Sequence, residues 1–109
     1  MRTFILFLAV FMGFLPIALA NEATKQYDLV IQDQSFAPQK LEVPAGQPFQ
    51  LIVKNTSSKT AEFESNDFKR EKILKPGQIA TIRVGALPAG NYKFFDEFNE
   101  NNQGTLVVK

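Results

Sequence analysis

Two short stretches of the chain concentrate side chains that could bind a metal ion through oxygen atoms. One is the segment AEFES at 61–65, and the other is DEFNE at 96–100. The candidate ligands are Glu62, Glu64, Asp96, Glu97, Asn99 and Glu100. Carboxylate and amide oxygens suit hard or borderline ions such as Fe(III), Fe(II), Mn(II) or Ca(II). Carboxylates held close together repel one another, and a bound cation relieves that repulsion.

The residue types that are missing narrow the chemistry further. The chain contains no cysteine and no histidine, which removes thiol redox chemistry, the commonest zinc ligand and any Ser-His-Asp arrangement. No glycine-rich phosphate loop is present, so a carboxylate pair is all that remains for acid–base work. We therefore do not expect an enzyme.

A second interpretation needs no metal, because acidic residues in loops are usually just solvated. Phe63 is the only large apolar residue in AEFES and is expected to point into the core, which places Glu62 and Glu64 on the outer face. On that face, a site that uses both glutamates needs a bulge or a strand end. Glu71, with Lys69, Arg70 and Lys72 around it, is interpreted as part of a surface ion-pair patch.

Short runs of strand length, broken by Pro and Gly, must position these residues. The predicted strands are Tyr27–Gln32, Lys40–Val43, Phe49–Lys54, Ala61–Ser65, Glu71–Leu74, Ala80–Val84, Asn91–Asp96 and Thr105–Lys109. Ser35–Pro38 is expected to form a turn, and the region around Phe68 could hold one helical turn at most. The pattern predicts an all-β sandwich of seven or eight strands in a single domain.

The first 20 residues have the features of a secretory signal peptide. Arg2 is followed by an apolar run from Phe4 to Leu19, and Ala18-Leu19-Ala20 forms a small-x-small cleavage site. We expect cleavage after Ala20, export to the periplasm or cell surface, and one domain over 21–109. Without Arg2 the 12 basic residues fall by one and balance the 11 acidic ones. Nucleic acid and anionic membranes are therefore not expected partners. We also expect a monomer.

Several motifs follow one another in a specific order. They are F-A-P, V-P-A-G, E-F-E-S, K-P-G, L-P-A-G-N-Y-K-F and G-T-L-V-V. From Tyr27 to Lys109 this order resembles the cupredoxin family. E-F-E-S together with F-F-D-E-F resembles a subgroup similar to the N-terminal domain of periplasmic Efe-type iron-uptake proteins. The resemblance implies a Greek-key β-sandwich with a metal site at one end, and association with a ferric-type membrane iron permease.

The resemblance also shows which copper ligands are missing. The first histidine of blue-copper members falls at Thr60 or Ala61, the cysteine at Asp96 and the second histidine at Asn99, while the methionine should precede Gly104. None of these positions carries a soft ligand, so a type 1 blue-copper centre is rejected. In the copper-binding fold the two acidic segments are neighbours. We therefore expect an ion with oxygen ligands, and the resemblance implies iron in the first place, with copper second.

Two aromatic residues near the second acidic segment leave another function open. Phe95 and Phe98 bracket Asp96 and Glu97. Core packing is the better interpretation for Phe95, whereas Phe98 could present an apolar contact to a partner. The alternative function is a metal-free binding module that docks to a membrane or periplasmic complex through Phe98.

Overall fold

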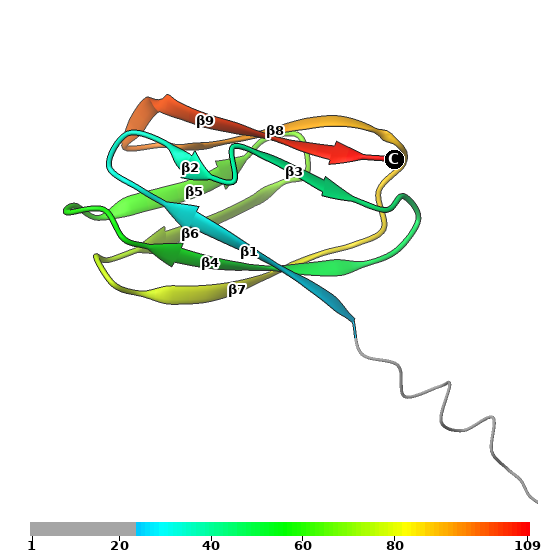
Figure 1. The fold of residues 1–109 in the computed structure, drawn as a ribbon, viewed down its shortest axis with the longest axis horizontal. Helices are drawn as coiled ribbons and strands as arrows, with labels where there is room; N and C mark the ends of the chain where they lie inside the picture. Colours follow the sequence, from blue (N-terminus) through cyan, green and yellow to red (C-terminus); the bar gives the residue numbers. More distant parts are fainter. Residues whose placement is uncertain (1–23) are drawn as a thin grey trace, which may run out of the picture.

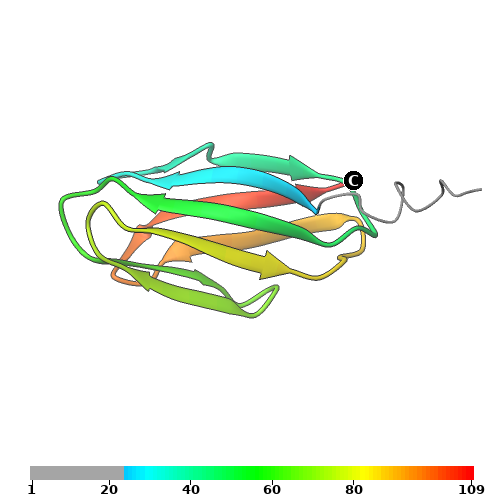
Figure 2. The same cartoon turned by 90° about the horizontal axis from the view of Figure 1, so that it is seen from below.

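The computed structural model describes residues 24–109 and shows two β-sheets packed face to face (Figure 1). Seen from below, the strands of both sheets run along the long direction of the sandwich (Figure 2). No helix long and apolar enough to cross a membrane occurs in this range. The predicted signal peptide, residues 1–20, lies outside the described residues. The prediction of an all-β sandwich is confirmed.

Nine strands make up the sandwich. They are β1 (Lys25–Ile31), β2 (Phe36–Ala37), β3 (Lys40–Val43), β4 (Phe49–Asn55), β5 (Ala61–Ser65), β6 (Arg70–Leu74), β7 (Ile79–Val84), β8 (Gly90–Asp96) and β9 (Asn99–Val108). All eight predicted strands are present. The ninth, β2, is a two-residue strand within the segment predicted as a turn. The residues around Phe68 form a turn and not a helix.

The larger difference concerns β9, which begins well before the predicted Thr105. Asp96 pairs with Asn99 and Phe95 pairs with Gln103, so a register shift leaves 100–102 without partners on β8. A bulge of this kind bends the strand and changes the direction in which nearby side chains point. It replaces the long polar loop that the sequence predicts.

The four-stranded sheet has the order β2-β1-β4-β7, and the five-stranded sheet has the order β3-β9-β8-β5-β6. Strands β1 and β4 are parallel, as are β3 and β9, while the other neighbours are antiparallel. Along the chain, consecutive strands change sheet after β2, β3, β4, β6 and β7, as in a Greek-key sandwich. β6 is an edge strand of the five-stranded sheet.

Alternate residues of both sheets fill the core. Leu29, Leu51, Phe63 and Leu106 are all fully buried, as expected for strands that present every second side chain to the interior. Phe36 packs edge-on against Phe94, with ring centroids 4.8 Å apart.

Close packing around Phe94 depends on a glycine. A Cβ atom at Gly104 would collide with the ring of Phe94 and would lie 2.9 Å from the backbone oxygen of Gln39. Glycine is therefore needed where β9 crosses this ring.

The hairpin of β5 and β6 is fixed at both ends by buried polar groups. At one end, the Asn55 amide donates hydrogen bonds to the backbone oxygens of Lys59 and Leu74, each at 2.9 Å. At the other, the Ser65 hydroxyl donates to the Lys93 oxygen at 2.6 Å and accepts from the Phe68 amide at 3.2 Å. These contacts set the register of the hairpin.

Candidate metal site

Three glutamates gather on the outer face of the β5–β6 hairpin. Phe63 is fully buried, so Glu62 and Glu64 on either side of it point outward, as predicted. The hairpin register places Glu71 of β6 directly opposite Glu64. One carboxylate oxygen from each of Glu62, Glu64 and Glu71 lies within 4.8 Å of the other two. We call these three residues the acidic patch.

Crowding in the acidic patch affects the protonation of two of its members. Loss of water contact raises the pKa of Glu62, and the charges of Glu64, Glu71 and Glu97 raise it further. The pKa of Glu64 is also raised, again first by loss of water contact and then by Glu97 and Glu71. A cation placed among these groups would reverse the repulsion. Oxygen-only donors fit hard and borderline ions, and they do not fit the soft cuprous ion.

Glu97 lies next to the acidic patch at the turn between β8 and β9. Its backbone amide donates a hydrogen bond to the backbone oxygen of Glu62 at 2.8 Å. Its negative charge raises the pKa of both Glu62 and Glu64. The turn therefore adds a fourth carboxylate beside the patch.

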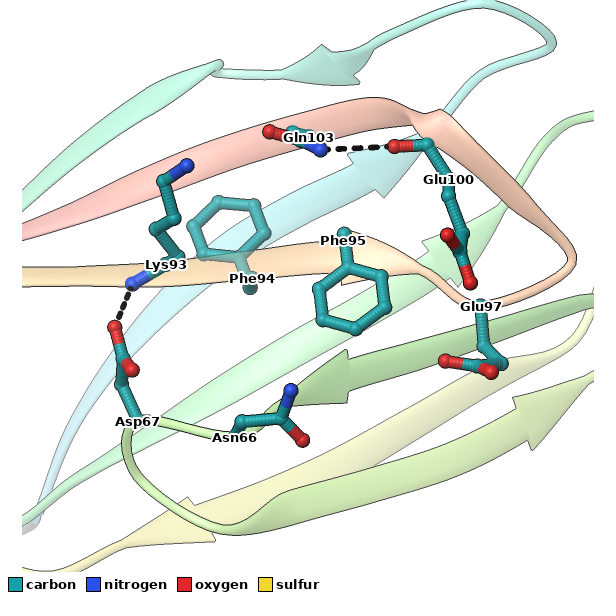
Figure 3. Close-up of a pocket in the computed structure, with 8 residues that line it drawn as sticks. All are labelled: Asn66, Asp67, Lys93, Phe94, Phe95, Glu97, Glu100 and Gln103. Atoms are coloured by element: carbon teal, nitrogen blue, oxygen red, sulfur yellow. Dashed lines mark hydrogen bonds between the residues drawn. The ribbon is translucent and has the colours of Figure 1, made fainter.

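A groove of about 390 Å³ runs beside this turn, with Phe95 at its centre (Figure 3). Glu97 and Glu100 both line it, and the Glu100 backbone oxygen accepts a hydrogen bond from Gln103 Nε2 at 3.0 Å. Phe95 is only partly buried and pairs with Glu64 on β5. Its ring thus lies on the outer face rather than in the core, which corrects the expectation of core packing.

Asp96 does not join the acidic patch. It is 6% exposed and lies opposite Phe63, on the interior side of the five-stranded sheet. Its Oδ1 atom accepts hydrogen bonds from the Glu62 amide at 2.9 Å and the Phe98 amide at 3.0 Å. Asp96 therefore fastens the β8–β9 turn to β5, and its carboxylate does not share a face with those of Glu62 and Glu64.

Asn99 and Phe98 lie in a third place, a polar hollow of about 570 Å³ at the end of the sandwich. Asp33, Thr60 and Asp96 also line this hollow, and Asn99 Nδ2 donates to the Asp33 backbone oxygen at 3.3 Å. The six predicted ligands thus divide into outer-face carboxylates and residues at the polar end. The structure does not bring them together in one site.

Glu71 was not among the ligands predicted from the sequence, where we interpreted it as part of a surface ion-pair patch. Within residues 24–109 the only ion pair joins Lys109 Nζ to Glu42, at 3.2 Å, so that assignment is corrected. The sequence did indicate that Glu71 could lie near Glu62 and Glu64, because the two short strands that carry them are joined by a tight turn and must be antiparallel. Recognising it required the register, which depends on the buried contacts of Ser65.

A family model for the cupredoxin-like domain matches residues 4–108 of the chain. Among curated proteins, an uncharacterized protein from Rickettsia prowazekii (strain Madrid E) is 34% identical over 89 residues. The alignment covers 81% of this chain and 71% of that protein.

Solved structures share the fold at low sequence identity. Reduced auracyanin from Roseiflexus castenholzii has a TM-score of 0.66 and 18% identity, over 81% of this chain and 99% of that one. A purple cupredoxin from Nitrosopumilus maritimus has a TM-score of 0.58 and 18% identity, over 75% and 98% of the respective chains. Auracyanin A from Chloroflexus aurantiacus, described as a "blue" copper protein, has a TM-score of 0.66 and 15% identity, over 80% and 100%. At sequence identities this low, the similarity shows only that the fold is shared.

Proposed function

The chain belongs to the cupredoxin-like domain family, and we propose that it is an exported protein that binds or relays a metal ion through carboxylate oxygens. The observation that supports this most directly is the acidic patch, whose three carboxylates approach within 4.8 Å of one another. A type 1 copper centre does not fit, because the chain has no cysteine to supply the thiolate. The chain has no histidine or cysteine to act as base or nucleophile, and the role that we propose is not enzymatic.

Iron is the proposed metal, with copper as the second candidate. Hard Fe(III) and borderline Fe(II) both accept oxygen ligands, whereas Cu(II) binds such ligands without the stabilisation that thiolate and imidazole give. The proposed partner is a membrane iron permease. Iron and permease are both inferred from the E-F-E-S and F-F-D-E-F motifs. Export is inferred from the signal-peptide pattern of residues 1–20.

Calorimetric titration of the metal-free protein tests metal binding. The titrants are Mn(II), Fe(II) under anaerobic conditions, ferric nitrilotriacetate and Cu(II). The test variant is Glu71→Gln. Loss of this charge should weaken binding at least tenfold, which corresponds to about 1.4 kcal/mol. Asp28→Asn, which neutralises an exposed carboxylate on β1 in the other sheet, is the matched control and should bind like the wild type. The proposal would be contradicted if none of the ions bound, or if Glu71→Gln and Asp28→Asn lowered the metal affinity equally.

A second candidate function is favoured by the exposure of Phe98. This side chain is 56% exposed beside the polar hollow, and a large apolar side chain in that position suits a contact with another protein. A metal-free docking module would then bind its membrane partner through Phe98.

Binding to the permease in lipid nanodiscs separates the two functions. If docking is the function, Phe98→Ser should abolish binding. Ile79→Ser, at a side chain that is 57% exposed on β7, should leave it unchanged. Metal binding that survives Phe98→Ser but is lost in Glu71→Gln would support the metal-binding function instead.

A further inference from the structure

Two arginines line a groove at the end of the sandwich where β1 and β4 begin and β7 ends. The groove has a volume of about 410 Å³, and Arg70 and Arg83 line it together with Phe49 and Gln50. None of the residues that line it is acidic. We call this feature the arginine groove. It shares no residue with the acidic patch and lies outside the function proposed above.

The guanidinium group of Arg70 is held in place by the backbone. Its Nε atom donates to the Arg83 oxygen at 2.7 Å, and its Nη1 atom donates to the Lys69 oxygen at 2.9 Å. A guanidinium has five N–H donors, so these two bonds orient the group and leave other donors for a ligand. An arginine oriented in advance loses less conformational entropy on binding than a free one.

The turn that leads into β6 is strained at the residue before Arg70. Lys69 has a φ angle of 57°, in the left-handed region that non-glycine residues seldom occupy. Such a conformation is unfavourable for a residue with a side chain and often occurs where a site must be held in a fixed geometry. Here it places the Lys69 carbonyl where Arg70 can donate to it.

Neither arginine forms an ion pair with a carboxylate in the part of the chain that the structure describes. Arg70 also lines a neighbouring hollow with Glu64 and Glu71, but it forms no ion pair with either. Two arginines line one groove, and neither is paired with a carboxylate in residues 24–109, so the groove favours an anion. A phosphate group suits them best, because it offers three or more oxygens, whereas a carboxylate offers two.

We propose that the arginine groove binds a phosphate group through the guanidinium groups of Arg70 and Arg83. The group is either free phosphate or part of a lipid head group, and both present the same oxygens to the arginines. Phe49 and Gln50, which begin β4, form the wall of the groove beside Arg83, their neighbour on β7.

The first test is an NMR titration of the protein with sodium phosphate at constant ionic strength, with chloride as the reference anion. Amide shifts should concentrate at Phe49, Gln50, Arg70 and Arg83. Arg83→Gln should weaken binding about tenfold or more, as expected when a charge-assisted hydrogen bond is lost. Arg70→Lys should also weaken it, because lysine keeps the charge but lacks the planar fork.

The matched control is Lys40→Gln, which removes one positive charge from β3, on the opposite edge of the same sheet as β6. This control should bind phosphate within about twofold of the wild type if the groove, and not net charge, is responsible. Equal weakening in Lys40→Gln and Arg83→Gln would overturn the proposal, as would shifts spread over all the lysines.

A second arm identifies the source of the phosphate. Flotation with phosphatidylglycerol vesicles, and with phosphatidylcholine vesicles as the reference, is carried out with the same variants. Binding to phosphatidylglycerol that Arg83→Gln removes and Lys40→Gln preserves supports a lipid head group. Phosphate binding without flotation supports a free anion. If the protein binds neither phosphate nor phosphatidylglycerol vesicles, the proposal is overturned. Metal binding by the acidic patch is tested separately, because the patch and the arginine groove share no residue.

Discussion

Among the individual residues, the three glutamates of the acidic patch are the clearest case of unfavourable electrostatics in the structure. A carboxylate whose pKa is raised in the folded protein destabilises the fold when it is ionised. Glu62 and Glu64 are both in this state, because loss of water contact raises the pKa of each and the nearby charges of Glu71 and Glu97 raise it further. Within residues 24–109 none of the three glutamates forms an ion pair, so no basic side chain there offsets the repulsion.

The pH dependence of stability follows from these raised pKa values. The destabilisation is fully present above the raised pKa values and disappears as the pH falls through them towards 4.5, the usual value. Glu71→Gln removes part of the repulsion, so the metal-free variant should be more stable than the wild type at pH 8. The difference should shrink on acidification. Urea unfolding at pH 8 and pH 5 measures it, and an unchanged or lower stability at pH 8 would contradict the explanation.

Asp96 illustrates the opposite case, a carboxylate that stabilises the fold. It accepts the backbone amides of Glu62 and Phe98, and removing such an acceptor leaves partly buried donors unpaired. Asp96→Ala should therefore cost about 2 kcal/mol.

Asp96→Asn should leave the cation affinity of the acidic patch within about twofold, since the carboxylate points to the interior side. Calorimetric titration of the Asp96→Asn variant with the same metal ions measures this affinity. A tenfold loss of affinity would place Asp96 among the ligands.

At the level of the strands, alternation was readable from the sequence and register was not. The buried Phe63 correctly predicted outward glutamates, because period-two alternation within one strand is a local property. The position of Glu71 opposite Glu64 depends on contacts of Ser65 with β8 and with the turn, which are remote in sequence. On β8 the same alternation, counted from the buried Phe94, places Phe95 outward and Asp96 inward, whereas the bulge between Phe95 and Asp96 depends on pairing with β9.

A substitution at Gly104 tests the packing of β9 against Phe94 of β8. An added Cβ atom would meet the Phe94 ring and the Gln39 oxygen, and overpacking of this kind costs about 1–3 kcal/mol. Gly104→Ala should lower the free energy of unfolding by that amount. Gly85→Ala is the matched control, because nothing lies within 4 Å of its added atom, and it should change stability little. Equal effects of the two substitutions in urea unfolding would show that β9 can move away from Phe94.

The whole molecule keeps the cupredoxin fold but carries a different set of potential ligands. The fold could be predicted from the sequence, because the turn motifs and strand spacing extend over the whole domain. A site that depends on a few side chains from different strands could be predicted only in residue type. The acidic patch lies on the outer face of the five-stranded sheet, while the polar end of the sandwich holds Asp33, Asp96 and Asn99. Oxygen donors of this kind favour harder ions than the thiolate and imidazole ligands of a blue-copper centre do.

The redox behaviour of added copper is the property of the whole molecule that tests this view. Cu(II) bound by oxygen atoms alone should show no intense blue band, because no thiolate is present for charge transfer. On reduction with ascorbate the ion becomes soft Cu(I), which carboxylates bind poorly. The protein should then release it to bicinchoninate as fast as a copper–acetate reference does. Retention of Cu(I) by the wild type, lost in Glu71→Gln, would show that the acidic patch stabilises both oxidation states and that electron transfer belongs among its functions after all.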